Sequence, residues 1–308
     1  MRDLEVEVKP GLGALAFLPA VAQDSSASRS SETMEQIAPR QHGEIRDRHD
    51  RGDGTSTSTN WSGYAVTGSS FTSAKGSWTV PTANCSGVSG SQYASFWVGL
   101  DGFNSNSVEQ TGTDSDCVGT RPSYYAWYEF YPHPSFQISG LTVSPGNQMS
   151  ASVVYSGGTF TLTITNVTTG RTFTKSGRVS GARRSSAEWI AEAPCCTGSG
   201  GILPLADFGT VLFGEDSTGI SGTNFATETS HSGAIGTFPA SNINEINKVG
   251  SSTSPRLSNC SLLSSDGTSF SCTWRRNSRV IGAYLTGVSN RSSADESPMT
   301  RICGTPRP

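Results

Sequence analysis

Polar and apolar residues alternate along many short stretches of this chain, and this alternation predicts β-strands. In residues 159–165, Phe160, Leu162 and Ile164 fall on one face and threonines on the other. Short segments rich in Trp, Tyr, Val and Thr recur at residues 60–66, 76–81, 124–131, 150–155, 210–213 and 280–285. No helical periodicity separates them, so the pattern favours an all-β fold, either a sandwich or a barrel.

The most informative stretch of the sequence is residues 95–112. An apolar run at 96–100 predicts one strand, and residues 108–112 predict a second. The small polar residues at 101–107 predict a loop between them, which gives a hairpin-like element.

Residues 187–192, Ala-Glu-Trp-Ile-Ala-Glu, place two carboxylates densely among apolar side chains. On a strand, Glu188 and Glu192 share one face, opposite Trp189 and Ala191. We expect this segment to meet the hairpin-like element. The two carboxylates would then line a cleft if their face of the sheet is concave.

The sequence predicts four parts in the chain. Residues 1–22 are a candidate signal segment, because an apolar run ends in Ala-Val-Ala, although the acidic residues before that run are atypical of a signal. Residues 23–55 are polar and are predicted to be a pro-segment or a disordered linker. Residues 56–288 are predicted to form the β domain, and residues 289–308 a C-terminal tail. This organisation favours a secreted, extracellular protein.

The composition limits the partners that we expect. The 308 residues carry a net charge of −3, and only 15% of them are charged. No basic stripe with interleaved aromatics occurs, so we expect no nucleic-acid partner. No run of ~20 apolar residues occurs, so we expect no membrane span.

Seven cysteines, an odd number, cannot all pair within one chain. Cys260 and Cys272 flank a predicted hairpin with Asp266-Gly267 at its turn, which favours a disulfide between them. Cys85 and Cys117 are a second candidate pair. Both disulfides would indicate an oxidising compartment, whereas reduced buried thiols are the alternative.

The common catalytic motifs are missing, which leaves carboxylates and amides as the candidate chemistry. The four histidines do not form the HExxH motif of a zinc peptidase, and no GxSxG turn occurs. We expect no metal and no cofactor. A carboxylate can act as a general base towards water, and an amide can donate a hydrogen bond to an oxyanion. Glu192 and Gln110 could divide these two roles.

Eight short matches in a constant order show that the sequence resembles the glutamic peptidase (eqolisin) family. They lie at residues 60–66, 97–102, 110–112, 125–132, 145–153, 166–170, 187–192 and 203–213. Each match alone is weak, whereas the ordered set is specific. The resemblance implies a sandwich of two curved antiparallel sheets, of the jelly-roll or concanavalin-like kind.

The resemblance also implies roles for individual residues. Gln110 and Glu192 would be the catalytic dyad, with Glu192 as the general base and Gln110 as the group that positions water and stabilises the oxyanion. Trp61 and Trp97 would line the substrate cleft. Asp101 and Glu129 match acidic positions nearby, assigned here to substrate binding as supporting residues.

One departure from the family pattern is Glu109, which stands directly before Gln110 where an apolar residue is expected. As a strand neighbour it should face the other side of the sheet.

The resulting expectation is a monomeric, secreted, acid-type endopeptidase that acts on polypeptide substrates. One alternative is a non-catalytic carbohydrate-binding sandwich, because curved sheets with exposed Trp and Tyr bind sugars and a fold does not fix a function. Another is an inactive homologue of the peptidases.

Overall fold

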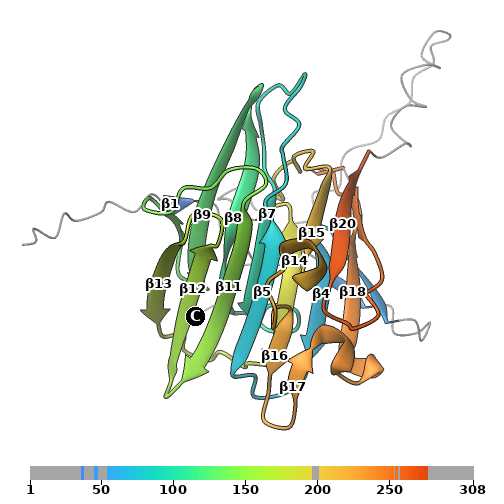
Figure 1. Cartoon of the computed structure of the whole chain (residues 1–308). Coiled ribbons are helices and arrows are strands. Elements are labelled where there is room, and N and C mark those ends of the chain that lie inside the picture. Colours follow the sequence, from blue (N-terminus) through green and yellow to red (C-terminus); the bar gives the residue numbers. More distant parts are fainter. Residues whose placement is uncertain are drawn as a thin grey trace, which may run out of the picture. The chain divides into compact units, whose positions relative to one another are not determined.

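The computed structural model describes residues 36–37, 45–47, 54–195, 201–252, 254–255 and 257–276. Nearly all regular structure in these residues is β, arranged in two layers (Figure 1). The predicted all-β sandwich is therefore confirmed. Helical structure is limited to the short α1 (Glu215–Thr218), η2 (Ile235–Thr237) and η3 (Ala240–Asn242).

The first layer carries the residues predicted to be catalytic. Its neighbouring strands follow the order β1–β10–β9–β8–β7–β14–β4–β18–β3–β2, antiparallel except for β18 and β3. The strands are β1 (Gln36–Ile37), β2 (Ile45–Asp47), β3 (Thr55–Ser58), β4 (Trp61–Thr67), β7 (Ser95–Leu100), β8 (Val108–Val118), β9 (Arg121–Tyr131), β10 (Ser135–Ile138), β14 (Ser186–Glu192) and β18 (Ile243–Lys248). A two-residue strand β6 (Ser91–Gln92) pairs with β8.

The second layer follows the order β13–β12–β11–β5–β15–β20–β19. Its strands are β5 (Ser73–Thr79), β11 (Gln148–Ser156), β12 (Thr159–Asn166), β13 (Arg171–Gly177), β15 (Thr210–Phe213), β19 (Leu257–Cys260) and β20 (Phe270–Arg275). The small hairpin of β16 (Phe225–Thr227) and β17 (Ser232–Ala234) extends β5 at its other end. One residue pair between β18 and β19, Lys248 with Ser258, joins the two layers.

The main hydrophobic core lies between the layers. Trp78 of β5 and Trp189 of β14 are fully buried there, with Phe96, Val98 and Phe213. Both indoles bond across the gap: Trp78 Nε1 donates to Thr113 Oγ1 at 2.9 Å, and Trp189 Nε1 donates to the Lys75 carbonyl at 2.8 Å. Because side chains alternate along a strand, Trp189 in this core places Glu188 and Glu192 on the opposite face of the first layer, as predicted.

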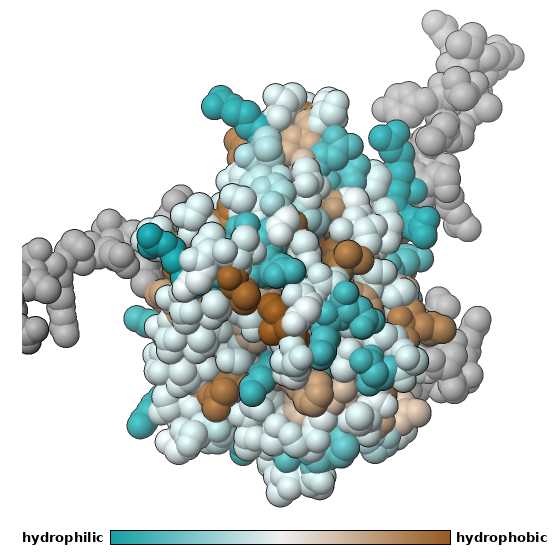
Figure 2. Space-filling model, viewed as in Figure 1, coloured by the Kyte–Doolittle hydropathy of each residue, from teal (hydrophilic) through white to brown (hydrophobic). Residues whose placement is uncertain are grey.

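On their exposed side, β12 and β13 are joined by pairs of hydrogen-bonded hydroxyl groups. We call these pairs the hydroxyl ladder. Its pairs are Thr161 with Ser176 (3.0 Å), Thr163 with Thr174 (3.2 Å) and Thr165 with Thr172 (2.9 Å). Figure 2 shows that the surface viewed from this side is mostly of intermediate hydropathy, with small and separate apolar patches.

Both predicted disulfides are present. Cys85 bonds to Cys117, and Cys260 of β19 bonds to Cys272 of β20 across the predicted hairpin. No helix in the described residues is long and apolar enough to cross a membrane.

Three predicted segments fall wholly outside the described residues: 1–22, 280–285 and 289–308. Residues 23–55 contain the described strands β1 and β2 and the first residue of β3. Their assignment as a pro-segment or linker stays a prediction.

Candidate active site

Glu192 is the last residue of β14 and is fully buried. Trp97 Nε1 donates to its Oε2 at 2.7 Å, and Asn60 Nδ2 donates to its Oε1 at 3.1 Å. Both bonds favour the ionised carboxylate, because a charged acceptor forms the stronger hydrogen bond. Glu192 is thus a carboxyl group held in one orientation by an indole of the neighbouring strand β7 and an amide of the turn before β4.

Asn60 is a residue for which the sequence predicted no role. It lies between β3 and β4, and Ser58 Oγ donates to its Oδ1 at 3.1 Å. The same hydroxyl accepts the backbone N–H groups of Asn60 and Trp61, at 3.2 and 3.1 Å. This turn orients the Asn60 amide, so that its nitrogen points to Glu192. The sequence signal was a Ser-x-Asn pair at the start of a strand, which is typical of a side-chain-bonded turn.

Gln110 lies on β8, directly opposite Glu129 of β9. Its Nε2 donates to Glu129 Oε2 at 2.7 Å, and both residues are fully buried. The cross-strand pair fixes which way the amide points, because the carboxylate can only accept. Glu129 therefore contacts Gln110 directly, and its predicted role in substrate binding stays a prediction.

Gln110 and Glu192 lie on the same face of the first layer, on either side of β7. Gln110 is in register with Gly99 of β7, and Glu192 with Ser95. A Cβ at Gly99 would lie 3.0 Å from the Trp97 ring and 3.1 Å from the Gln110 Cβ. The Trp97 indole therefore extends from the Glu192 carboxylate to the backbone beside Gln110.

A small apolar cluster surrounds these polar groups on the same face. Trp61, Trp97 and Trp127 belong to it with Ile190, and none of the three indoles has exposed surface. Trp61 and Trp97 meet edge to face, with ring centroids 5.0 Å apart. In the structure these rings build the wall around Glu192, and their predicted contact with substrate stays a prediction.

Asp101 directly follows β7 and is fully buried. Its carboxylate accepts the backbone N–H groups of Arg184 and Ser185, at 2.6 and 2.9 Å, and the Ser185 hydroxyl at 3.2 Å. These bonds anchor the chain that leads into β14. They support Glu192 through the position of its strand, and substrate contact by Asp101 stays a prediction.

Two further buried carboxyl groups, Glu109 and Glu188, have raised pKa values. Burial, with the nearby Asp101 charge, raises the pKa of Glu109 to about 9. Burial raises the pKa of Glu188 well above its usual range. Glu109 therefore holds its proton in acid and at neutrality. The raised pKa of Glu188 makes it a poor candidate for a general base in acid, although it shares a face with Glu192.

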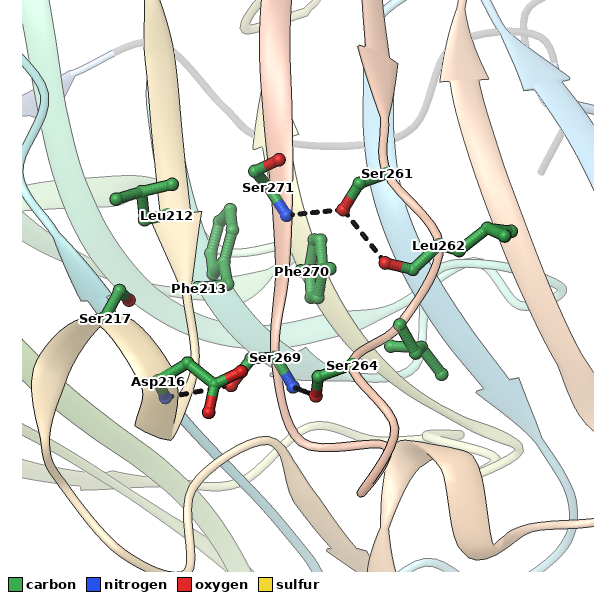
Figure 3. Close-up of a pocket in the computed structure, with 11 residues that line it drawn as sticks. Leu212, Phe213, Asp216, Ser217, Ser261, Leu262, Ser264, Ser269, Phe270 and Ser271 are labelled. Carbon is green, nitrogen blue, oxygen red and sulfur yellow. Dashed lines mark hydrogen bonds between the residues drawn. The ribbon is translucent and has the colours of Figure 1, made fainter.

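No group of three or more His, Cys, Asp or Glu in the described ranges could hold a metal ion. A pocket of about 400 Å³ lies on the second layer between β15, α1 and the β19–β20 hairpin (Figure 3). Serines and the apolar Leu212, Phe213 and Phe270 line it, and Asp216 is its single carboxylate. That lining offers no second titratable group to work with Asp216, so the first layer carries the better candidate site.

A family profile and two curated proteins match this chain. The profile of the Peptidase A4 family matches residues 59–274. Aspergillopepsin-2 of Aspergillus niger is 35% identical over 178 residues, which are 51% of this chain and 62% of that protein. Scytalidopepsin B of Scytalidium lignicola is 37% identical over 159 residues, 49% of this chain and 59% of that protein. The chain thus spans about three fifths of the length of these curated relatives.

Solved structures show the same likeness. A crystal structure of scytalido-glutamic peptidase with a transition-state analogue inhibitor superimposes with a TM-score of 0.56 at 28% identity, covering 70% of this chain and 98% of that one. SCP-B, described as a member of the eqolisin family in a complex with the tripeptide Ala-Ile-His, gives 0.52 at 26% identity with the same coverage.

Proposed function

This chain belongs to the Peptidase A4 family, and from that premise we propose that it is a secreted glutamic endopeptidase, active in acid, whose dyad is Glu192 and Gln110. The observation that carries the proposal is the carboxylate of Glu192, held by donors from Trp97 and Asn60 on the face that also bears Gln110. A general base must be held at a fixed position beside the proton that it removes, and the two bonds to Glu192 hold it in this way.

In the proposed mechanism, Glu192 removes a proton from water as the water oxygen attacks the peptide carbonyl carbon. Negative charge then develops on the carbonyl oxygen, and the Gln110 amide donates a hydrogen bond to it. Of the two hydrogens on Gln110 Nε2, Glu129 accepts one, and we assign the other to the oxyanion. When the C–N bond breaks, Glu192 returns its proton to the leaving nitrogen.

An acid range of activity follows from the chemistry of the base. A carboxyl group with an ordinary pKa of about 4 is ionised above that pH. General acid–base catalysis is most efficient when the pKa of the catalytic group lies near the operating pH, which favours an acid range for a carboxyl group. Glu109 and Glu188 stay protonated under these conditions and add no competing base.

Polypeptide is the substrate class that we propose. The crystal structure of SCP-B holds a tripeptide, and one of scytalido-glutamic peptidase holds a peptide-based transition-state analogue. Secretion is supported by the two disulfides, because disulfides persist in oxidising compartments. For the carbohydrate-binding alternative, five of the six tryptophans are fully buried and only Trp274 is half-buried.

The test is hydrolysis of denatured casein by the full chain, measured from about pH 2 to about pH 7. Glu192→Gln keeps the shape of the side chain and removes the base, so we expect a loss of roughly a hundredfold to ten-thousandfold. Asp216→Asn is the matched control, because it neutralises an exposed carboxylate on the other layer. Casein hydrolysis that survives Glu192→Gln would assign the base to another residue, and an equal loss in Asp216→Asn would reject the first-layer site.

A further inference from the structure

A second pocket, of about 280 Å³, lies where β9 and β10 of the first layer approach β13, at the end of the second layer. Its floor is aromatic and contains Tyr128, Phe130 and Phe136. Tyr128 stacks on Phe136 and on Phe173, with centroids 5.7 and 5.5 Å apart and interplanar angles of 27°. These stacked rings make a firm apolar base, because Tyr128 and Phe130 are largely buried.

The rim of this pocket is cationic. Lys175, Arg178 and His133 line it, and no Asp or Glu is among the residues that do. The Lys175 Nζ lies 6.0 Å from the centre of the Tyr128 ring, so its charge stands over the aromatic floor. Cations gathered around an apolar floor without a lining carboxylate attract an anion.

The shape and the charge together define the ligand. A guanidinium group binds a carboxylate through two parallel hydrogen bonds, and a nearby ammonium group adds a point charge. The pocket is slightly smaller than the sites that take drug-sized ligands, which begin near 300 Å³, so a compact ligand is indicated. We propose that this pocket binds a carboxylate carried on a small apolar body, such as an aromatic ring.

The proposed carboxylate pocket is distinct from the candidate active site. Tyr128 and Phe130 flank Glu129 in sequence, and side chains alternate along β9. Glu129 therefore contacts Gln110 on one face of the strand, while its two neighbours face the pocket on the other. Neither Gln110 nor Glu192 lines the pocket, so this inference stands whether or not the chain is a peptidase.

Two sources could supply such a carboxylate: a free aromatic acid, or the carboxyl terminus of a peptide with an apolar last residue. Benzoate is the probe for the first source. The tripeptide Ala-Ala-Phe is the probe for the second, with its C-terminal amide as the uncharged comparison. Using the Glu192→Gln chain for the peptides prevents turnover from consuming them.

The experiment is a titration followed by NMR at about pH 5, where benzoate is ionised. The protein has four histidines, so the His133 ring signals can be assigned by its replacement with Gln. We expect benzoate to shift the His133 signals in a saturable way, and benzyl alcohol to leave them in place. If Ala-Ala-Phe shifts the His133 signals and its C-terminal amide does not, a peptide chain terminus is a source of the carboxylate. If benzoate alone shifts them, the source is a free acid.

Two variants separate specific binding from general attraction. Lys175→Gln combined with Arg178→Gln removes the two permanent charges, and we expect benzoate affinity to fall about tenfold or more. Arg121→Gln removes one exposed charge from the far end of β9, and we expect no change. Unchanged affinity in the double variant, or equal shifts with benzyl alcohol, would overturn the proposal.

Discussion

At the scale of single residues, each candidate catalytic group is held by a neighbour that does no chemistry itself. Trp97 and Asn60 hold Glu192, and Glu129 holds Gln110. Charged hydrogen bonds of this kind contribute about 1.5–3 kcal/mol each. The residues around the dyad should therefore affect the rate even where they never touch the substrate.

Trp97→Phe tests this at the indole nitrogen. The ring remains in the wall, but the donor to Glu192 Oε2 is lost. We expect kcat/KM for a peptide substrate to fall by roughly tenfold to a hundredfold, the equivalent of one charged hydrogen bond. Trp78→Phe is the control, because it also removes one buried indole donor, but in the core between the layers. A similar fall in both variants would attribute the effect to packing.

At the scale of elements, the β8–β9 pairing sets the direction of the Gln110 amide. Glu129→Ala leaves that amide without its partner, and we expect kcat to fall about tenfold with KM little changed. Glu129→Gln supplies an acceptor oxygen again and should recover most of the rate. Equal rates in the Ala and Gln variants would show that Glu129 does not position Gln110.

A glycine allows β7 and β8 to approach each other beside Trp97. A Cβ at Gly112 would lie 2.3 Å from the Phe96 carbonyl oxygen and 2.6 Å from the Trp97 Cβ. We expect Gly112→Ala to lower the free energy of unfolding by about 3 kcal/mol, because neither neighbour can move without shifting a strand. Gly140→Ala is the control, since nothing lies within 4 Å of its Cβ position. Denaturant unfolding of both variants makes the comparison.

At the scale of the whole molecule, the buried carboxyl groups favour stability in acid. An unfolded glutamate titrates near pH 4.5, whereas Glu109 in the fold titrates at about 9. Between these values the unfolded chain has released a proton that the folded chain still holds, so stability falls as the pH rises. The contribution is largest below about pH 4.5 and is lost towards pH 9; Glu188 acts in the same direction. Burial also lowers the pKa of Lys248 to about 7, which opposes this trend only above that pH.

Glu109→Gln removes one of these titrations. We expect the decline in unfolding free energy between about pH 5 and pH 8 to be shallower in the variant by about 1.4 kcal/mol per pH unit. Urea unfolding at several pH values measures it, with Asp216→Asn as the exposed control. Parallel curves for the wild type and Glu109→Gln would contradict a buried, protonated Glu109.

The fold was largely predictable, because polar and apolar residues alternate along its strands and this alternation is visible in the local sequence. Residues 159–165 and 187–192 carry a period of two that assigns each side chain to a face, and both assignments agree with the structure. Hairpin spacing likewise predicted the bond between Cys260 and Cys272. Strand β18 was missed, although its Ile243–Lys248 segment alternates in burial, because Asn and Lys occupy some of its buried positions.

The supporting contacts of the site could not be derived from sequence. Asn60 and Glu192 are 132 residues apart, and their contact depends on the pairing of β14 with β4. Such a register is set by the assembled sheet and leaves no local pattern. The hydrogen bond between Gln110 and Glu129 could have been predicted, because their strands form a tight hairpin whose turn fixes the register.

The hydroxyl ladder on β12 and β13 gives this face a surface that solution conditions barely alter. Its Thr and Ser pairs bear no charge, so they neither protonate as the medium is acidified nor weaken as salt is added. A face joined by ion pairs would lose its links when its carboxylates took up protons. The hydroxyl ladder therefore meets water in the same way in an acidic, salty medium and in a neutral one.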